Sequence, residues 1–270
     1  MVLPTTQLAA ALLLLACAVC WAAWIFASKV AVSRWRYELY YFDVCVGLLL
    51  TSIAIVFTLG TLGSEMTFGD RLLVAGLTAK TWAVLGGIAL SLGNFLFLAG
   101  LSLQNGRSAL LTIAAALILN FSWIYATRGG NILLPAFVLC ALFIGVLGFG
   151  FASATARKGP AKILAKARAI LLTGSIFLGG FYPLTRGGLY TDIGVGPYGA
   201  LIIMSISIFV STLIFSIYFL NIPVNGPPVG LTEYRGSSLG QHLRGWLGGV
   251  LYAAALICLL LGISVGAVAI

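Results

Sequence analysis

Long apolar runs separated by shorter polar connectors set the limits on what this chain can fold into. A helix needs about 20 apolar residues to cross a bilayer, and about eight runs approach that length. Hydrophobic residues make up 61% of the chain, charged residues 8%, and the mean hydropathy is +1.12. This balance excludes a soluble protein and predicts an all-α, polytopic membrane protein. The expected spans are 8–30, 42–61, 82–103, 108–126, 132–155, 168–186, 198–220 and 246–268.

The positive charges alternate between heavily and lightly charged connectors. Connectors on the cytoplasmic side carry an excess of Lys and Arg, so the more basic set is expected inside and the N-terminus outside. The first run has no basic stretch before it and is too long for a signal peptide, so we expect it to remain as a span. The odd-numbered connectors contain Lys29, Arg34, Arg36, Arg107, Arg157, Lys158, Lys162, Lys166, Arg168, Arg235 and Arg244, and the even-numbered ones contain Arg71, Lys80, Arg128 and Arg186.

The connectors differ in character. Those after the third and fourth runs are short, which requires antiparallel neighbouring helices. Residues 64–81 are weakly amphipathic and are expected on the membrane interface, whereas the Pro- and Gly-rich stretch 221–246 is not expected to form one regular helix. Residues 156–168 form the basic connector. The net charge of +9 comes from such connectors rather than from a basic domain, so nucleic acid is not expected as a partner.

An internal repeat is the strongest pointer to mechanism. LGGI at Leu85 recurs as LGGV at Leu247, 162 residues later, and each begins a Gly- and Leu-rich span. The same offset brings the first span close to Phe181, Tyr182 and Pro183. This pattern indicates that spans one to five and the spans from the sixth onward are two copies of one structural unit. Because each unit has an odd number of spans, the two copies have inverted orientations in the membrane. This divides the chain into a first repeat at 1–155, the connector 156–168 and an incomplete second repeat at 169–270.

The segment 20–43 carries the richest chemistry of the chain. It contains two of the six acidic residues, Glu38 and Asp43. Asp43 is the first candidate for proton coupling and Glu38 the second, because ionisable residues near membrane spans are candidate functional sites. Two structural interpretations of Asp43 remain open: a helix N-cap, and an ion pair with Arg34 or Arg36. The only histidine, His242, is interpreted as an interfacial residue.

Four further residues are candidates for binding a solute. Trp21 and Trp24 share one face of the first span and could stack on a flat ring, although packing is the commoner role of Trp. Asn94 lies deep in an apolar span and needs a partner on another helix or on a solute. Tyr182 precedes Pro183, where we expect a break or a kink in the sixth helix.

Motifs along most of the chain resemble the drug/metabolite transporter superfamily, and within it the ureide permease and sugar-porter-like branch and its bacterial relatives. They are CWAAW, WRYELYYFD, LGGIALSLGN, FYPLTRGGLYTDIGVGPYG, PVNGPPVG and YRGSSLGQHLRGWLGG. The resemblance implies ten spans in two inverted five-span repeats, a bacterial inner membrane location, and import of ureides, nucleobases or sugars. The chain departs from that pattern because two spans have no counterpart after Ile270, as in a fragment or a shortened member.

These features together predict a secondary transporter, or permease, for a small polar metabolite. The alternative is a non-transporting structural or interaction module. An enzyme is not expected, because no cluster of His, Asp or Glu marks one membrane face. No spacing suits a metal, the connector 156–168 lacks a phosphate-binding loop, and no cofactor is expected. The expected partners are a small-molecule solute and the lipid bilayer, and a homo-oligomer is left open.

Overall fold

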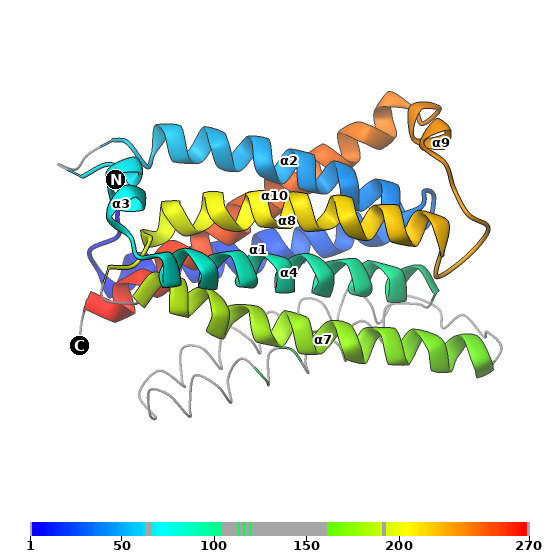
Figure 1. Ribbon diagram of the computed structural model, residues 1–270, viewed down its shortest axis with the longest axis horizontal. Coiled ribbons are helices and arrows are strands. Elements are labelled where there is room, and N and C mark those ends of the chain that lie inside the picture. Colours follow the sequence, from blue (N-terminus) through cyan, green and yellow to red (C-terminus); the bar gives the residue numbers. More distant parts are fainter. Residues whose placement is uncertain are drawn as a thin grey trace.

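A computed structural model of the chain describes residues 2–62, 66–103, 113, 116, 119, 161–190 and 193–268 (Figure 1). The described residues form helices and connectors without strands. Within these residues, six helices are long and apolar enough to cross a membrane, and they lie side by side along the long axis of the molecule. They are α1 (Gln7–Val32), α2 (Tyr37–Thr58), α4 (Leu77–Leu103), α7 (Ala161–Tyr190), α8 (Gly196–Asn221) and α10 (Leu239–Val268).

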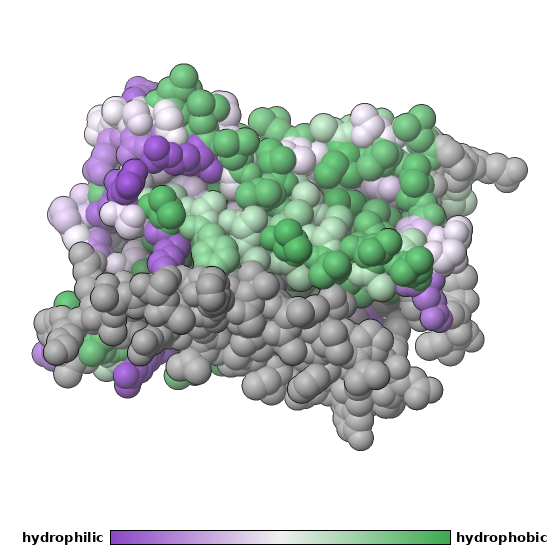
Figure 2. Space-filling model, turned by 180° about the vertical axis from the view of Figure 1, so that it is seen from behind, coloured by the Kyte–Doolittle hydropathy of each residue, from purple (hydrophilic) through white to green (hydrophobic). Residues whose placement is uncertain are grey.

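The six helices confirm that this is a polytopic membrane protein. At 1.5 Å per residue, helices of this length reach about 33–45 Å, enough for the hydrocarbon core of a bilayer. Apolar side chains cover the middle of the visible face, and hydrophilic ones gather at its ends (Figure 2). Leu172, Ile176 and Ile217 are among the side chains more than 60% exposed on these helices. The predicted spans at 108–126 and 132–155 lie outside the described residues, apart from Ile113, Ala116 and Leu119.

The six long helices pack closely against one another. The most extensive packing joins α4 to α7, followed by α1 to α10, then α10 to α2, then α4 to α8, and α2 also contacts α8. Glycines allow the closest crossings: a Cβ on Gly249 of α10 would lie 2.7 Å from the carbonyl carbon of Gly47 in α2. A Cβ on Gly87 of α4 would lie 2.8 Å from the Met204 carbonyl oxygen in α8. Both LGG motifs therefore mark places where two backbones meet.

The connectors follow the sequence-based expectations where the structure describes them. Between α2 and α4 lies the short helix α3 (Phe68–Val74), whose N-terminus is closed by a capping box between Thr67 and Asp70. The hydrogen bonds that the Asp70 carboxylate accepts from Thr67 hold the pKa of Asp70 below its ordinary value. The stretch 221–246 is not one helix: it contains the short helix α9 (Leu231–Arg235) before α10 begins.

Two helix boundaries differ from the sequence-based expectations. Of the break or kink expected at Pro183, the break is wrong, because α7 runs through this residue without interruption. Proline costs the helix one backbone hydrogen bond there, and the neighbouring Thr185 hydroxyl donates to the Phe181 carbonyl at 2.8 Å. The basic connector is also shorter than predicted, since residues 161–168 already belong to α7.

Most basic residues of the described part of the chain belong to segments at one end of the molecule, the end that carries α9. That end is formed by the ends of α1, α4 and α8 and the starts of α2, α7 and α10. Among the described residues it holds Lys29, Arg34, Arg36, Lys162, Lys166, Arg168, Arg235 and Arg244, and the opposite end holds Arg71, Lys80 and Arg186. In the described part of the chain, the first and seventh connectors therefore lie at one end and the second and sixth at the other.

Candidate functional site

An aromatic and polar cluster lies within the helices around Tyr252 of α10. The Asn94 side-chain amide of α4 donates to the Tyr252 hydroxyl, and both residues are buried. Trp24 of α1 lies with its ring centroid 5.0 Å from that of Tyr252, and Trp21 lies at 6.4 Å. Phe181 of α7 meets Trp21 edge-on at 6.1 Å. Three of the four predicted solute-binding residues, Trp21, Trp24 and Asn94, therefore meet at one place.

Several polar atoms of this cluster lack a hydrogen-bond partner within the described residues. They are the indole nitrogens of Trp21 and Trp24 and the Tyr41 hydroxyl, all inaccessible to water. The Tyr41 hydroxyl is near Asn94 and Ser91 but in no hydrogen-bonding geometry with them. A buried donor without a partner costs about 1–3 kcal/mol. The cluster therefore offers donors to a polar group that enters it.

The cluster lies well inside the predicted bilayer. Trp24 is eight residues before the end of α1 and Asn94 nine residues before the end of α4. At 1.5 Å per residue these distances are about 12 and 14 Å, near half of the hydrocarbon thickness. Neighbouring hydroxyls are already satisfied: Ser91 pairs with Thr212 at 2.8 Å, and Ser205 donates to Ser52 at 2.8 Å. Of the six buried side-chain atoms without a partner in the described residues, three belong to this cluster, and the others lie on Trp35, Tyr37 and Ser216.

The fourth predicted residue, Tyr182, lies on α7. It is partly buried and packs against the core from α7. Its neighbour Phe181 is the α7 residue that meets Trp21. Because α7 continues through Pro183, no helix end lies beside Tyr182.

Asp43 joins three elements near the α9 end of the molecule. Its side chain is fully buried, accepts a hydrogen bond of 2.5 Å from Tyr234 of α9, and lies 2.7 Å from the His242 Nδ1 of α10. Trp35 meets the His242 ring edge-on at 5.5 Å. Burial and the nearby Asp43 carboxylate raise the pKa of Tyr234, so its hydroxyl remains a donor. These three residues form a Tyr234–Asp43–His242 network.

Both structural interpretations of Asp43 are wrong. Asp43 is no N-cap, because α2 begins at Tyr37 and its N-cap position is Arg36. Among the described residues, neither Arg34 nor Arg36 forms an ion pair with Asp43, and Arg36 binds Glu38 instead. His242, interpreted as merely interfacial, is the partner of Asp43. The Asp43 carboxylate therefore contacts an imidazole and a phenol, two groups that can each donate a hydrogen bond to it.

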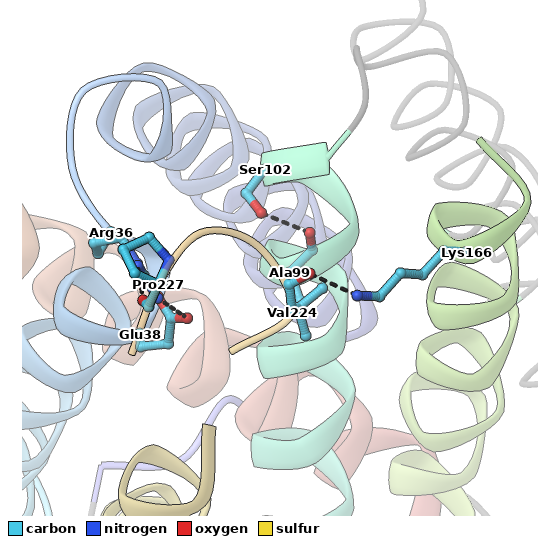
Figure 3. A network of polar contacts seen from close by, with 7 residues as sticks. All are labelled: Arg36, Glu38, Ala99, Ser102, Lys166, Val224 and Pro227. Atoms are coloured by element: carbon cyan, nitrogen blue, oxygen red, sulfur yellow. Dashed lines mark hydrogen bonds and ion pairs between the residues drawn. The ribbon is translucent and has the colours of Figure 1, made fainter. Parts of the chain in front are cut away.

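Glu38, the second coupling candidate, lies in a different environment. The Arg36 Nε and NH2 groups donate to its two carboxylate oxygens at 3.1 and 3.0 Å, and this hydrogen bonding raises the pKa of Arg36. A third nitrogen of Arg36 donates to the Pro227 carbonyl at 3.0 Å. From the other side, Lys166 of α7 donates to the Val224 carbonyl at 2.7 Å (Figure 3). Arg36 and Lys166 thus bind the segment that follows α8 through two of its backbone carbonyls.

Replacing Arg36 by methionine is expected to lower the free energy of unfolding by about 2 kcal/mol, because the buried Glu38 carboxylate loses its charged hydrogen bonds. Thermal unfolding of the purified protein in detergent measures the change. The double variant Arg36→Met with Glu38→Leu removes the stranded charge and is expected to recover most of the loss. A double variant no more stable than the single one would contradict this role of Glu38.

Sequence reasoning missed three residues of these sites. Tyr252 lies 158 residues from Asn94, and Tyr234 and His242 lie 191 and 199 residues from Asp43. The sequence feature that could have identified these three residues is a polar side chain inside or beside an apolar span. No group of three or more potential metal ligands occurs among the described residues.

Comparison of the chain with models of known families, with curated proteins and with solved structures found no match.

Proposed function

We propose that this chain is a secondary transporter that carries a small polar metabolite across the membrane. The observation that supports it most directly is the Tyr252 cluster, where the Trp21, Trp24 and Tyr41 donors lie unpartnered at mid-helix depth. Polar groups within a membrane are costly and are retained where they serve a pathway or a site. Transporters place their solute sites at this depth, between two halves of the molecule.

An inverted repeat, as in the drug/metabolite transporter superfamily, is the second part of the proposal, and glycine contacts support it. Gly87 of α4 and Gly249 of α10 stand 162 residues apart, and so do Gly100 and Gly262. Gly87 meets Met204 and Ser207 of α8, and Gly249 meets Val44 and Leu48 of α2. Gly100 meets Leu171 of α7, and Gly262 meets Leu14 of α1. Equivalent glycines therefore meet equivalent partners.

The order of helix packing supports the same symmetry. If α1, α2 and α4 correspond to α7, α8 and α10, the pair α4–α7 becomes α10–α1, and the pair α2–α10 becomes α8–α4. These are the two most extensive pairs and the two that follow them. The Asn94–Tyr252 hydrogen bond then joins one half to the other. In the proposed transporter the solute site lies on this boundary, where rocking of the halves opens it to each side in turn.

The chemistry of the cluster favours a flat solute with amide-like groups. Indole and phenol rings stack on planar rings, and an Asn amide can both donate to and accept from a ureide or a nucleobase. A sugar is compatible with the same donors. We place the α9 end in the cytoplasm of the proposed transporter, with the N-terminus outside, because basic residues favour that side. A bacterial inner membrane would suit this arrangement.

The test is a thermal-stability screen of the full chain in detergent with uracil, allantoin and sugars. A ligand at about 100 times its Kd raises the free energy of unfolding by about 2.7 kcal/mol. We expect one class to give a saturable shift, and we expect Asn94→Leu to weaken that binding about ten-fold or more, through loss of its polar contact.

Asn221→Leu is the matched control, because it removes the same amide at the exposed end of α8. It should leave the affinity for the solute unchanged. Equal weakening by both variants, or no saturable shift with any of the three classes, would count against the proposed solute site.

A further inference from the structure

A cavity of about 290 Å³ lies at the α9 end, between the end of α1 and the first turns of α10. It is separate from the Tyr252 cluster, which lies deeper between the helices. The size would hold a phosphate group together with part of the molecule that carries it. Its lining consists of Ala31, Arg34, Trp35, Ser238, Gln241 and Arg244.

The charge of this cavity is positive and uncompensated within the described residues. Arg34 and Arg244 are exposed, and neither forms an ion pair with a described carboxylate. The two acidic residues of the neighbouring stretch are occupied elsewhere: Glu38 binds Arg36, and Asp43 binds His242 and Tyr234. Two guanidinium groups that line one cavity repel each other, and an anion between them removes that repulsion.

Neutral groups of the lining suit the same ligand. The Gln241 side-chain oxygen accepts from the Ser238 backbone N–H at 2.8 Å and from its hydroxyl at 3.1 Å, so the Gln241 amide nitrogen remains available to donate. Ser238 directly precedes α10, whose N-terminal dipole favours negative charge. The Trp35 indole nitrogen is buried without a hydrogen-bond partner in the described residues.

We propose that this cavity binds a phosphate-bearing anion through Arg34, Arg244 and the start of α10. Two sources of that chemistry exist at a membrane surface, the headgroup of an anionic phospholipid and a soluble phosphate compound. Three exposed apolar residues lie within two positions of a lining residue in the sequence: Val30, Leu243 and Trp246. Basic pockets at the ends of membrane helices bind anionic headgroups in this way.

The experiment compares Arg34→Gln/Arg244→Gln with the control Lys162→Gln/Arg235→Gln. The control removes the same charge from exposed residues at the same end, outside the cavity. Native mass spectrometry of the purified chain, titrated with dioleoylphosphatidylglycerol or dioleoylphosphatidylcholine, gives lipid affinities. Inorganic phosphate, at ionic strength matched with sodium chloride, is tested by thermal stability.

A preference of about ten-fold for the anionic lipid, lost only in the cavity variant, would establish a lipid site. A saturable stabilisation by inorganic phosphate without lipid preference, again lost only in the cavity variant, would assign the cavity to a soluble phosphate compound. Equal behaviour of both variants would overturn the proposal, as would wild-type protein that prefers neither probe. None of these readouts depends on solute transport. Failure of the cavity proposal is therefore distinguishable from failure of the proposed transporter function.

Discussion

Gly249→Ala is expected to lower the free energy of unfolding by about 2 kcal/mol or more, the range for overpacking a tight helix contact. The added Cβ would lie within 3.0 Å of the Val44 carbonyl oxygen, the Leu48 nitrogen and the Gly47 carbonyl carbon, all backbone atoms of α2. Backbone atoms cannot rotate away, so the two helices must separate. Thermal unfolding in detergent, followed by size-exclusion chromatography, measures the loss.

Gly240→Ala is the matched control in the same helix. A Cβ there meets no atom within 4 Å, and alanine is the better helix former by about 0.5–1 kcal/mol. The control should therefore be as stable as the wild type or slightly more so. If Gly249→Ala shared that gain, the close crossing of α2 and α10 would be wrong.

Gly87→Ala extends the test to the proposed repeat. Its Cβ would meet Met204 and Ser207 of α8 at 2.8 Å. If α4 and α10 occupy equivalent places, Gly87→Ala and Gly249→Ala should both destabilise, while one loss without the other would argue against the symmetry. This arm tests the repeat without any knowledge of the solute.

The sequence predicted the helices well because burial in lipid depends mainly on composition. Six predicted spans correspond to long apolar helices in the described part of the chain. The ends were harder to predict. The stretch YELYYFD resembles an interfacial connector because it is rich in aromatic and charged residues, and the prediction therefore began the second span at residue 42. The structure begins α2 at Tyr37, because Arg36 and His242 compensate the buried Glu38 and Asp43.

The candidate site was only half visible in the sequence. Trp21, Trp24 and Asn94 stood out because large or polar side chains within an apolar run need an explanation. Tyr252 did not stand out, since a tyrosine in a span can serve packing alone. The sequence suggested nearby arginines as one possible partner of Asp43, whereas its partner His242 lies 199 residues away. Such pairings depend on which helices become neighbours, and spacing along the chain does not contain that information.

Asp43→Asn is expected to abolish proton-driven accumulation of the solute while leaving its exchange across the membrane intact. Asparagine can still accept from Tyr234 and bond to His242, so the Tyr234–Asp43–His242 network keeps its shape. It cannot gain or lose a proton. One proton moving down about 100 mV provides about 2.3 kcal/mol. One pH unit adds about 1.4 kcal/mol. Together they correspond to a several hundred-fold accumulation that the variant would lose.

Proteoliposomes with an imposed pH gradient and membrane potential measure accumulation, and counterflow at zero gradient measures exchange. Tyr234→Phe is the matched control, because it removes one hydrogen bond from Asp43 but keeps the carboxylate. It should cost about 1 kcal/mol of stability and retain accumulation. If Asp43→Asn accumulates the solute like the wild type, with unchanged pH dependence, Asp43 does not couple protons. The network would then serve only to hold α2, α9 and α10 together, because its three side chains come from those three helices.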